Sequence, residues 1–96
     1  MLAKEKAKDK IRVTFTSPII NDCECLYLVG DFNDWDAQSH PMEQGEDSTW
    51  SLTILLDEEQ VYQYRYYAEN GNWFNDTDAD DYQPNPFGSD NSVVTT

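Results

Sequence analysis

The chain has 96 residues, which is the size of one small domain and excludes a catalytic barrel of about 250 residues. Nineteen acidic and six basic side chains give it a formal charge of −13. Four of the bases are lysines within residues 1–10, so residues 11–96 hold two bases against seventeen acids, a charge of −15. Because such a surface repels polyanions, we expect neither nucleic acid nor membrane as a partner.

The first ten residues, MLAKEKAKDK, combine helix-forming side chains with no apolar face. This pattern predicts a frayed, flexible and charged leader over residues 1–10, followed by a single domain over residues 11–96. The sequence shows no signal peptide and no run of about eighteen apolar residues, so we expect a cytoplasmic protein.

From residue 11 onward, apolar and polar side chains alternate as they do in half-buried strands. The alternation is clearest just before Asn70 and Gly71, a pair that strongly indicates a hairpin turn. Two long polar loops are expected, over residues 30–42 and 75–91. In chain order, strands are expected at residues 11–16, 25–29, 49–55, 61–68, 72–74 and 91–94.

About six strands without a helical period predict an all-β fold, a small immunoglobulin-like antiparallel β-sandwich. Inward positions of these strands carry large aromatic side chains, which we expect in the core. They are Phe15, Trp50, Tyr62, Tyr64 and Tyr66.

The many carboxylates suggest two kinds of chemistry, a glycosidase-like acid pair and a calcium loop. An acid pair must be held across a cleft, and this domain is too small to enclose one, so we expect no catalysis. Asp76, Asp78 and Asp80 occupy the first three ligand positions of a calcium loop. However, Asp81 replaces the glycine that such a loop needs, and Phe87 replaces its bidentate glutamate. A solvated acidic loop is the favoured interpretation.

Cys23 and Cys25 are two residues apart on an extended segment, a spacing that seldom allows a disulfide. His40 is the only histidine, so four zinc ligands are not available. We expect two reduced thiols, no metal and no cofactor.

Two tryptophans fall outside the alternating strands: Trp35 lies between two aspartates in a loop, and Trp73 follows the hairpin turn. They could fold over the ends of the sandwich, or form a platform for a sugar. A sugar ring has an apolar C–H face and a rim of hydroxyls, so it needs flat aromatic surfaces beside directional polar groups. Arg65, Ser89, Asn91 and the amides around Asn85 could supply the polar groups, or be a strand charge and turn formers.

Two groups of motifs resemble one known family. GDFNDW at residues 30–35, with HPM at 40–42, resembles the early-set domain of glycogen branching enzymes and isoamylases. GNW at residues 71–73 and PFGSDNSVV at 86–94 resemble the glycogen-binding domain of the AMP-activated protein kinase β subunit. Both domains belong to carbohydrate-binding module family 48, and the resemblance covers residues 11–95.

The resemblance implies an early-set sandwich that binds α-1,4-linked glucan, glycogen-like or starch-like, or a maltooligosaccharide, without catalysis. The family's two stacking tryptophans match Trp35 and Trp73, its hydroxyl-binding lysine and asparagine match Arg65 and Asn91, and its leucine and threonine match Phe87 and Ser89. Arginine for lysine keeps the charge but changes the donor geometry. A glycogen-metabolising enzyme is a possible partner. The alternative is a spacer or protein-interaction module that docks an enzyme through the same aromatic surface.

Overall fold

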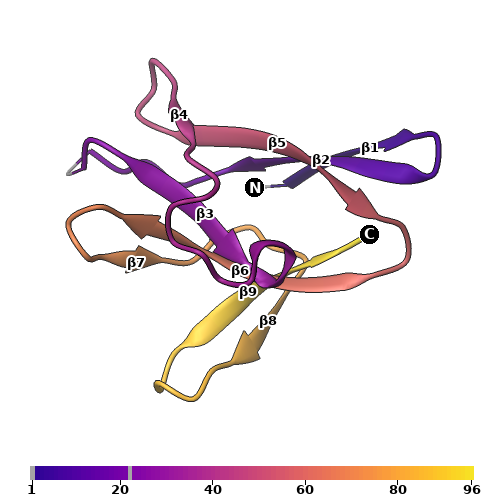
Figure 1. Cartoon of the computed structure of the whole chain (residues 1–96). Coiled ribbons are helices and arrows are strands. Elements are labelled where there is room, and N and C mark those ends of the chain that lie inside the picture. The colour runs from indigo at the N-terminus through magenta and orange to yellow at the C-terminus, as the bar shows by residue number, and fades with distance from the viewer. Residues whose placement is uncertain (1, 22) are drawn as a thin grey trace.

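The computed structural model describes residues 2–21 and 23–96 and confirms the all-β sandwich, with two antiparallel sheets packed face to face (Figure 1). The first sheet has the spatial order β1 (Leu2–Ala7), β2 (Lys10–Thr16), β5 (Trp50–Asp57) and β4 (Glu43–Gln44). The second has the order β3 (Leu26–Gly30), β6 (Val61–Ala68), β9 (Asp90–Thr95) and β8 (Asp81–Pro84), and β7 (Trp73–Phe74) also pairs with β6. A short 3-10 turn, η1 (Asp31–Asn33), follows β3.

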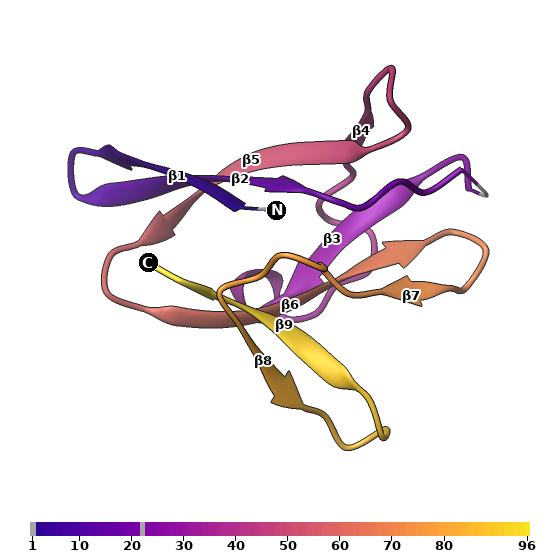
Figure 2. The same cartoon turned by 180° about the vertical axis from the view of Figure 1, so that it is seen from behind.

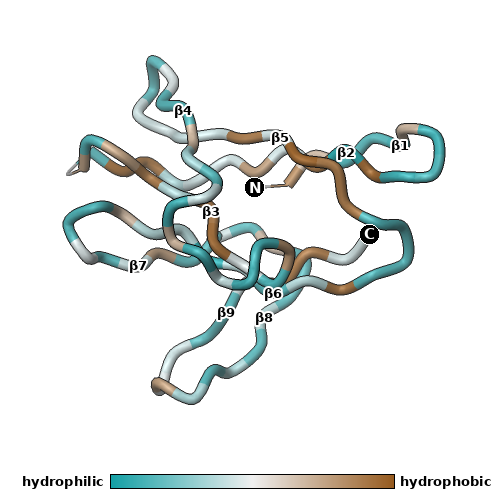
Figure 3. Tube along the Cα trace, viewed as in Figure 1, coloured by the Kyte–Doolittle hydropathy of each residue, from teal (hydrophilic) through white to brown (hydrophobic). Residues whose placement is uncertain are grey.

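The core lies between the two sheets and is rich in aromatic side chains. Figure 3 shows hydrophobic residues concentrated on the strands and polar residues on most connecting loops. The rings of Tyr64 and Phe15 pack in a T-shaped arrangement across the sheets, with ring centroids 4.9 Å apart. The prediction of the core is confirmed for Phe15, Trp50, Tyr64 and Tyr66, which are buried, whereas Tyr62 is half-buried at its margin.

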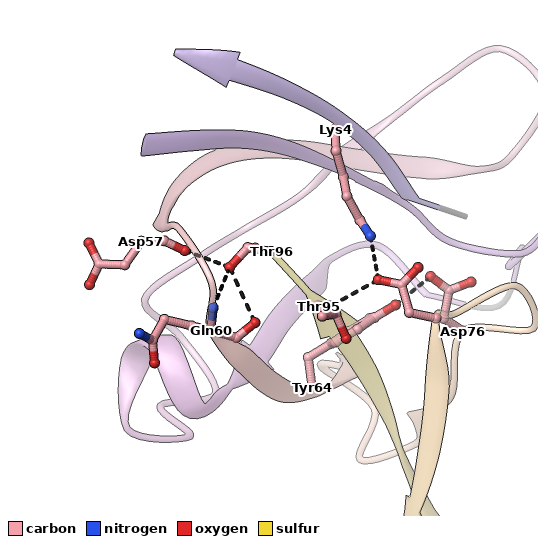
Figure 4. Close-up of polar contacts among 8 residues, drawn as sticks. Lys4, Asp57, Gln60, Tyr64, Asp76, Thr95 and Thr96 are labelled. Atoms are coloured by element: carbon pink, nitrogen blue, oxygen red, sulfur yellow. Dashed lines mark hydrogen bonds and ion pairs between the residues drawn. The ribbon is translucent and has the colours of Figure 1, made fainter. Parts of the chain in front are cut away.

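The prediction of a frayed leader is wrong for Leu2–Ala7, which form the edge strand β1, while Met1 lies outside the described residues. Leu2 packs against the core, and the ammonium of Lys4 bonds the carboxylate of Asp80 at 2.5 Å. Figure 4 shows Lys4 extending from β1 toward the other sheet. The alternation is hidden in the sequence because lysines occupy the inward positions after Leu2. Their apolar stems can cover an edge while their charged ends reach acids at the surface.

Two further strands were not predicted. β8 lies within the expected polar loop, and all four of its side chains are exposed, so it has no apolar alternation to reveal it. β4 has only two residues, both exposed. Both strands lie at sheet edges, where pairing through the backbone does not require a buried side chain. No helix in the described part of the chain is long and apolar enough to cross a membrane.

The acidic loop is not wholly solvated as predicted, because Asp76 is only 1% exposed. Its Oδ2 accepts hydrogen bonds from the hydroxyls of Tyr64 at 2.8 Å, a contact shown in Figure 4, and Tyr66 at 3.0 Å. Its backbone N–H donates to the Ser92 hydroxyl at 2.9 Å. The carboxylate can be buried because two tyrosine hydroxyls offset the loss of water. Asp78, by contrast, is exposed as expected.

The buried carboxylate generates a stability prediction. Asp76→Ala leaves two buried tyrosine hydroxyls without their acceptor, so we expect a loss of about 3 kcal/mol in the free energy of unfolding. Urea unfolding followed by tryptophan fluorescence measures it. The matched control is Asp78→Ala, an exposed position two residues away that should change stability by less than about 0.5 kcal/mol. Equal stability of the two variants would contradict the structural role of Asp76.

The same cluster predicts a loss of stability in alkali. Burial, and then the neighbouring Asp76 carboxylate, raise the pKa of Tyr66; burial, Tyr66 and Asp76 raise that of Tyr64. Because these hydroxyls ionise more easily in the unfolded chain, the stability they provide is complete below about pH 10 and falls as the pH rises further. Ultraviolet titration of tyrosinate beside circular dichroism should show both rings ionising only with unfolding. Reversible ionisation of all six tyrosines in folded protein would contradict this.

Candidate functional site

A pocket of about 410 Å³ lies on the outer face of the sheet that contains β3, β6, β9 and β8. Arg65 faces this side because it alternates with the buried Tyr64 and Tyr66 along β6. Ser89 is on the same hairpin as Phe87 but does not line the pocket; the other five predicted site residues do. The lining consists of Trp35, Arg65, Trp73, Asn85, Pro86, Phe87 and Asn91.

Gly30, the last residue of β3, lies close against β6 just before the loop that carries Trp35. A Cβ at Gly30 would lie 2.5 Å from the carbonyl oxygen of Gln63, so only glycine lets the chain pass this close to β6. Asn33 then closes the turn, accepting a hydrogen bond from the Gly30 N–H at 3.0 Å and donating to the Leu28 carbonyl at 3.0 Å. The GDFN sequence therefore has a structural role, because its contacts set the path of the chain into Asp34 and Trp35.

Trp35 is held in an unusual backbone conformation. Its φ of 57° and that of Asp34, 55°, both lie in the left-handed region, which costs a non-glycine residue about 1 kcal/mol or more. The indole N–H donates to Asp31 Oδ1 at 2.9 Å, and the Trp35 backbone N–H donates to the Gly30 carbonyl at 3.0 Å. These bonds fix the half-buried ring against the pocket with its nitrogen already engaged, which leaves the ring faces for contact.

Trp73 lines the side of the pocket opposite Trp35 and lies on β7, just past the hairpin turn. Its side chain is 42% exposed, and its ring lies 4.6 Å from that of Tyr67, the residue it pairs with on β6. The Arg65 guanidinium carbon lies 5.7 Å from the Trp73 ring centroid. The two tryptophans thus line one pocket and do not act as plugs at the ends of the sandwich.

Arg65 is the one charged residue in the lining. Its Nε donates to Asn75 Oδ1 at 3.0 Å, and Asn75 in turn donates to the Asp90 carbonyl at 2.7 Å. Partial burial lowers the pKa of the guanidinium, which still stays protonated near neutral pH. Among the described residues it makes no ion pair.

The third side of the pocket is the hairpin between β8 and β9, which projects away from the sandwich in both Figure 1 and Figure 2. Asn85 Oδ1 accepts hydrogen bonds from the N–H groups of Phe87 at 3.0 Å and Ser89 at 3.1 Å. Gly88 supplies the positive φ of 82° that this turn requires. The turn presents the Phe87 ring to solvent, 89% exposed, at the rim of the pocket.

The sequence did not identify the full lining. From the sequence, Asn85 stands out only as a source of amides and Pro86 only as the first residue of the PFGSDNSVV motif, because the hairpin that places them depends on β8. Tyr67, which supports Trp73, was recognised only as a strand residue. A signal for the hairpin was present in the turn-forming residues between Gln83 and Asp90.

The lining combines three aromatic rings with two amides and one guanidinium, and the described lining contains no carboxylate although the chain carries 19 acids. Flat apolar surfaces beside donor groups suit a ligand with both an apolar face and a hydroxyl rim. No pair of acids faces across the pocket, so this lining offers no acid and base for glycoside hydrolysis.

The profile of carbohydrate-binding module 48, described as the isoamylase N-terminal domain, matches residues 21–82. The chain belongs to carbohydrate-binding module family 48. It is therefore a carbohydrate-binding module, as the resemblance of its motifs implied. The pocket lies partly on the matched segment and partly on the hairpin that follows it.

Three relatives of this family-48 module are 1,4-alpha-glucan branching enzymes. That of Aquifex aeolicus is 35% identical over 63 residues, covering 65% of this chain and 10% of the enzyme. Those of Bacillus cytotoxicus and Synechococcus sp. (strain CC9605) are 35% identical over 72 residues and 31% over 68. They cover 73% and 70% of this chain and 11% and 9% of the enzymes. The module spans about a tenth of the length of the curated relatives it matches.

The close approach at Gly30 generates a prediction for the Trp35 loop. Gly30→Ala places a methyl group against the β6 backbone, so we expect a loss of about 2 kcal/mol in the free energy of unfolding. Gly45→Ala is the matched control, because the nearest atom to its Cβ would be a side-chain oxygen of Asp47 at 3.3 Å, and the nearest backbone atom would lie at an ordinary 3.6 Å. Urea unfolding compares the two. Equal stability of Gly30→Ala and wild type would show that the loop does not depend on this contact.

Proposed function

We propose that this module binds α-1,4-linked glucan, as glycogen, starch or maltooligosaccharide, by stacking sugar rings on Trp35 and Trp73. The observation that carries the proposal is that five residues picked out by separate motifs, far apart in sequence, line one pocket. The resemblance to glycogen-binding domains and the names of the relatives point to α-glucan as the ligand.

The proposed contacts follow from the chemistry of the lining. The indoles provide flat apolar surfaces for the C–H faces of glucose rings, while Arg65 and Asn91 donate hydrogen bonds to hydroxyls. Phe87 extends the apolar surface at the rim. Ser89 contributes by holding the hairpin, since its carbonyl accepts from the Asn85 N–H at 2.8 Å.

The charge of the module is compatible with this ligand. A neutral glucan is not repelled by a formal charge of −13, whereas a polyanion would be. An open pocket covers only part of a sugar chain, so we expect a dissociation constant on the order of micromolar to millimolar. Since the relatives are branching enzymes, we further propose that the module serves a cytoplasmic glucan-metabolising enzyme by holding glucan without catalysing a reaction itself.

The stacking proposal is tested by removing each indole. We expect Trp35→Ala and Trp73→Ala each to weaken β-cyclodextrin binding by at least about ten-fold, because each loses one stacking surface. Calorimetric titration and co-sedimentation with glycogen measure the loss. Leu55→Ala is the control, since this side chain is 57% exposed on the other sheet. Binding unchanged in both tryptophan variants would refute the proposed site.

A docking role remains the alternative, in which the aromatic surface binds a partner enzyme. The polar groups beside the rings, Arg65, Asn85 and Asn91, favour a sugar, since a purely apolar docking surface would not need them. Capture of a protein from native lysate, with and without excess maltoheptaose, separates the two. Capture that maltoheptaose does not displace, with no binding to glycogen, would favour docking.

A further inference from the structure

Two residues outside the pocket lining, Asp31 and Gln63, connect its two sides through a continuous series of hydrogen bonds. We propose that they are positioning residues, which fix the Trp35 loop relative to the Phe87 hairpin before ligand arrives and so favour glucans long enough to contact both. This inference rests on the proposed function and specifies the length of chain that the site selects.

The first half of the series ties Trp35 to β6 through one carboxylate. Asp31 Oδ1 accepts from the indole N–H of Trp35 at 2.9 Å, and Asp31 Oδ2 accepts from the backbone N–H of Gln63 at 2.7 Å. β3 ends at Gly30, so Asp31 supplies an acceptor just past the last backbone pair between β3 and β6. The Trp35 ring is thereby attached to β6, an inner strand of the sheet.

The second half runs from the side chain of the same residue to the hairpin. Gln63 Oε1 accepts from Asn91 Nδ2 at 3.0 Å, and Asn91 Oδ1 accepts from Asn85 Nδ2 at 3.2 Å. Asn85 Oδ1 then accepts from the backbone N–H of Phe87 at 3.0 Å. Gln63 is therefore the junction, holding the Trp35 side through its backbone and the Phe87 side through its side chain.

These hydrogen bonds fix the orientation of the Asn91 amide as well as the distance between the Trp35 loop and the Phe87 hairpin. Turning the amide of Asn91 would break its bonds to Gln63 and Asn85 together, and connected hydrogen bonds reinforce one another. Trp35 also occupies a strained backbone conformation, which must be held by its surroundings. A pocket whose sides are already in place spares the ligand the cost of ordering them.

The free energy that this preorganisation saves on binding depends on the length of the ligand. A chain that rests on both Trp35 and the Phe87 hairpin gains from their fixed separation, whereas a short sugar that contacts one side gains little. General destabilisation of the module would lower its affinity for long and short ligands by the same factor. The ratio of affinities for a long and a short maltooligosaccharide therefore separates positioning from a merely structural role.

The test uses Gln63→Leu, which keeps the backbone bond to Asp31 but removes the side-chain link to Asn91. We expect maltoheptaose to bind about ten-fold more weakly than to wild type, and maltotriose to bind within about two-fold. Both affinities are measured by calorimetric or nuclear magnetic resonance titration of the full chain. Gln44→Leu, on an exposed edge of the other sheet, is the control and should bind both sugars as wild type does.

Hydrogen exchange of the indole N–H groups tests the other link without any ligand. Asp31→Ala should speed exchange at Trp35 by about ten-fold or more, while Trp50, whose indole donates to the Ile20 carbonyl at 3.1 Å, stays slow. Unchanged exchange at Trp35 would overturn the role of Asp31.

The outcomes also separate this inference from the proposed function. Wild type that bound neither maltooligosaccharide would refute the proposed function and this inference with it. The positioning role alone would be refuted if wild type bound maltoheptaose and Gln63→Leu bound it equally well. It would also be refuted if Gln63→Leu lost affinity for maltoheptaose and maltotriose by the same factor.

Discussion

The buried, hydrogen-bonded carboxylate of Asp76 is the interaction on which the pocket depends. It sits between two tyrosine hydroxyls of β6 and fixes the chain two residues after β7 ends. That anchor sets the path of the short β7 strand and so places Trp73 over the outer face. It also places Asn75, which orients the guanidinium of Arg65 at 3.0 Å.

The alternation of β6 then couples the core to the site. Its inward side chains, Tyr64 and Tyr66, hold Asp76, and its outward side chains, Gln63, Arg65 and Tyr67, meet the loops that form the pocket. A one-residue change of register would exchange these two sets, placing an arginine and a glutamine in the core. The same eight residues of β6 therefore contribute to both the pocket and the hydrophobic core.

The loops around the pocket need rigidity from sources other than burial, because they lie on the outer face of a small sandwich. The Trp35 loop obtains it from the close passage of Gly30 over β6 and from the side chain of Asn33. The Phe87 hairpin obtains it from Asn85, whose side-chain oxygen Oδ1 accepts two backbone hydrogen bonds of the turn. In both loops a short polar side chain replaces the packing that a larger domain would supply.

The strands that could be predicted from the sequence are those in which apolar and polar side chains alternate. β2, β3, β5, β6 and β9 were found because one side of each strand is apolar. β1 was missed because lysines take inward positions beside the core, and β8 because none of its side chains is buried. The burial of Asp76 was missed because its partners lie ten and twelve residues away on another strand.

The site was predicted more fully than the loops around it, because its residues belong to recognisable motifs. Trp35, Arg65, Trp73, Phe87 and Asn91 line one pocket, whereas Ser89 does not. Pro86 and the supporting role of Tyr67 required the tertiary structure, since each depends on a contact between segments that the sequence does not order in space.

The most direct test of the central claim is a nuclear magnetic resonance titration of the ¹⁵N-labelled chain with maltoheptaose. The account predicts that the largest shifts fall on the indole groups of Trp35 and Trp73 and on the amides of Phe87 and Asn91, while β1, β2, β4 and β5 are unaffected. Shifts confined to those four strands, or no shifts at millimolar sugar, would contradict it.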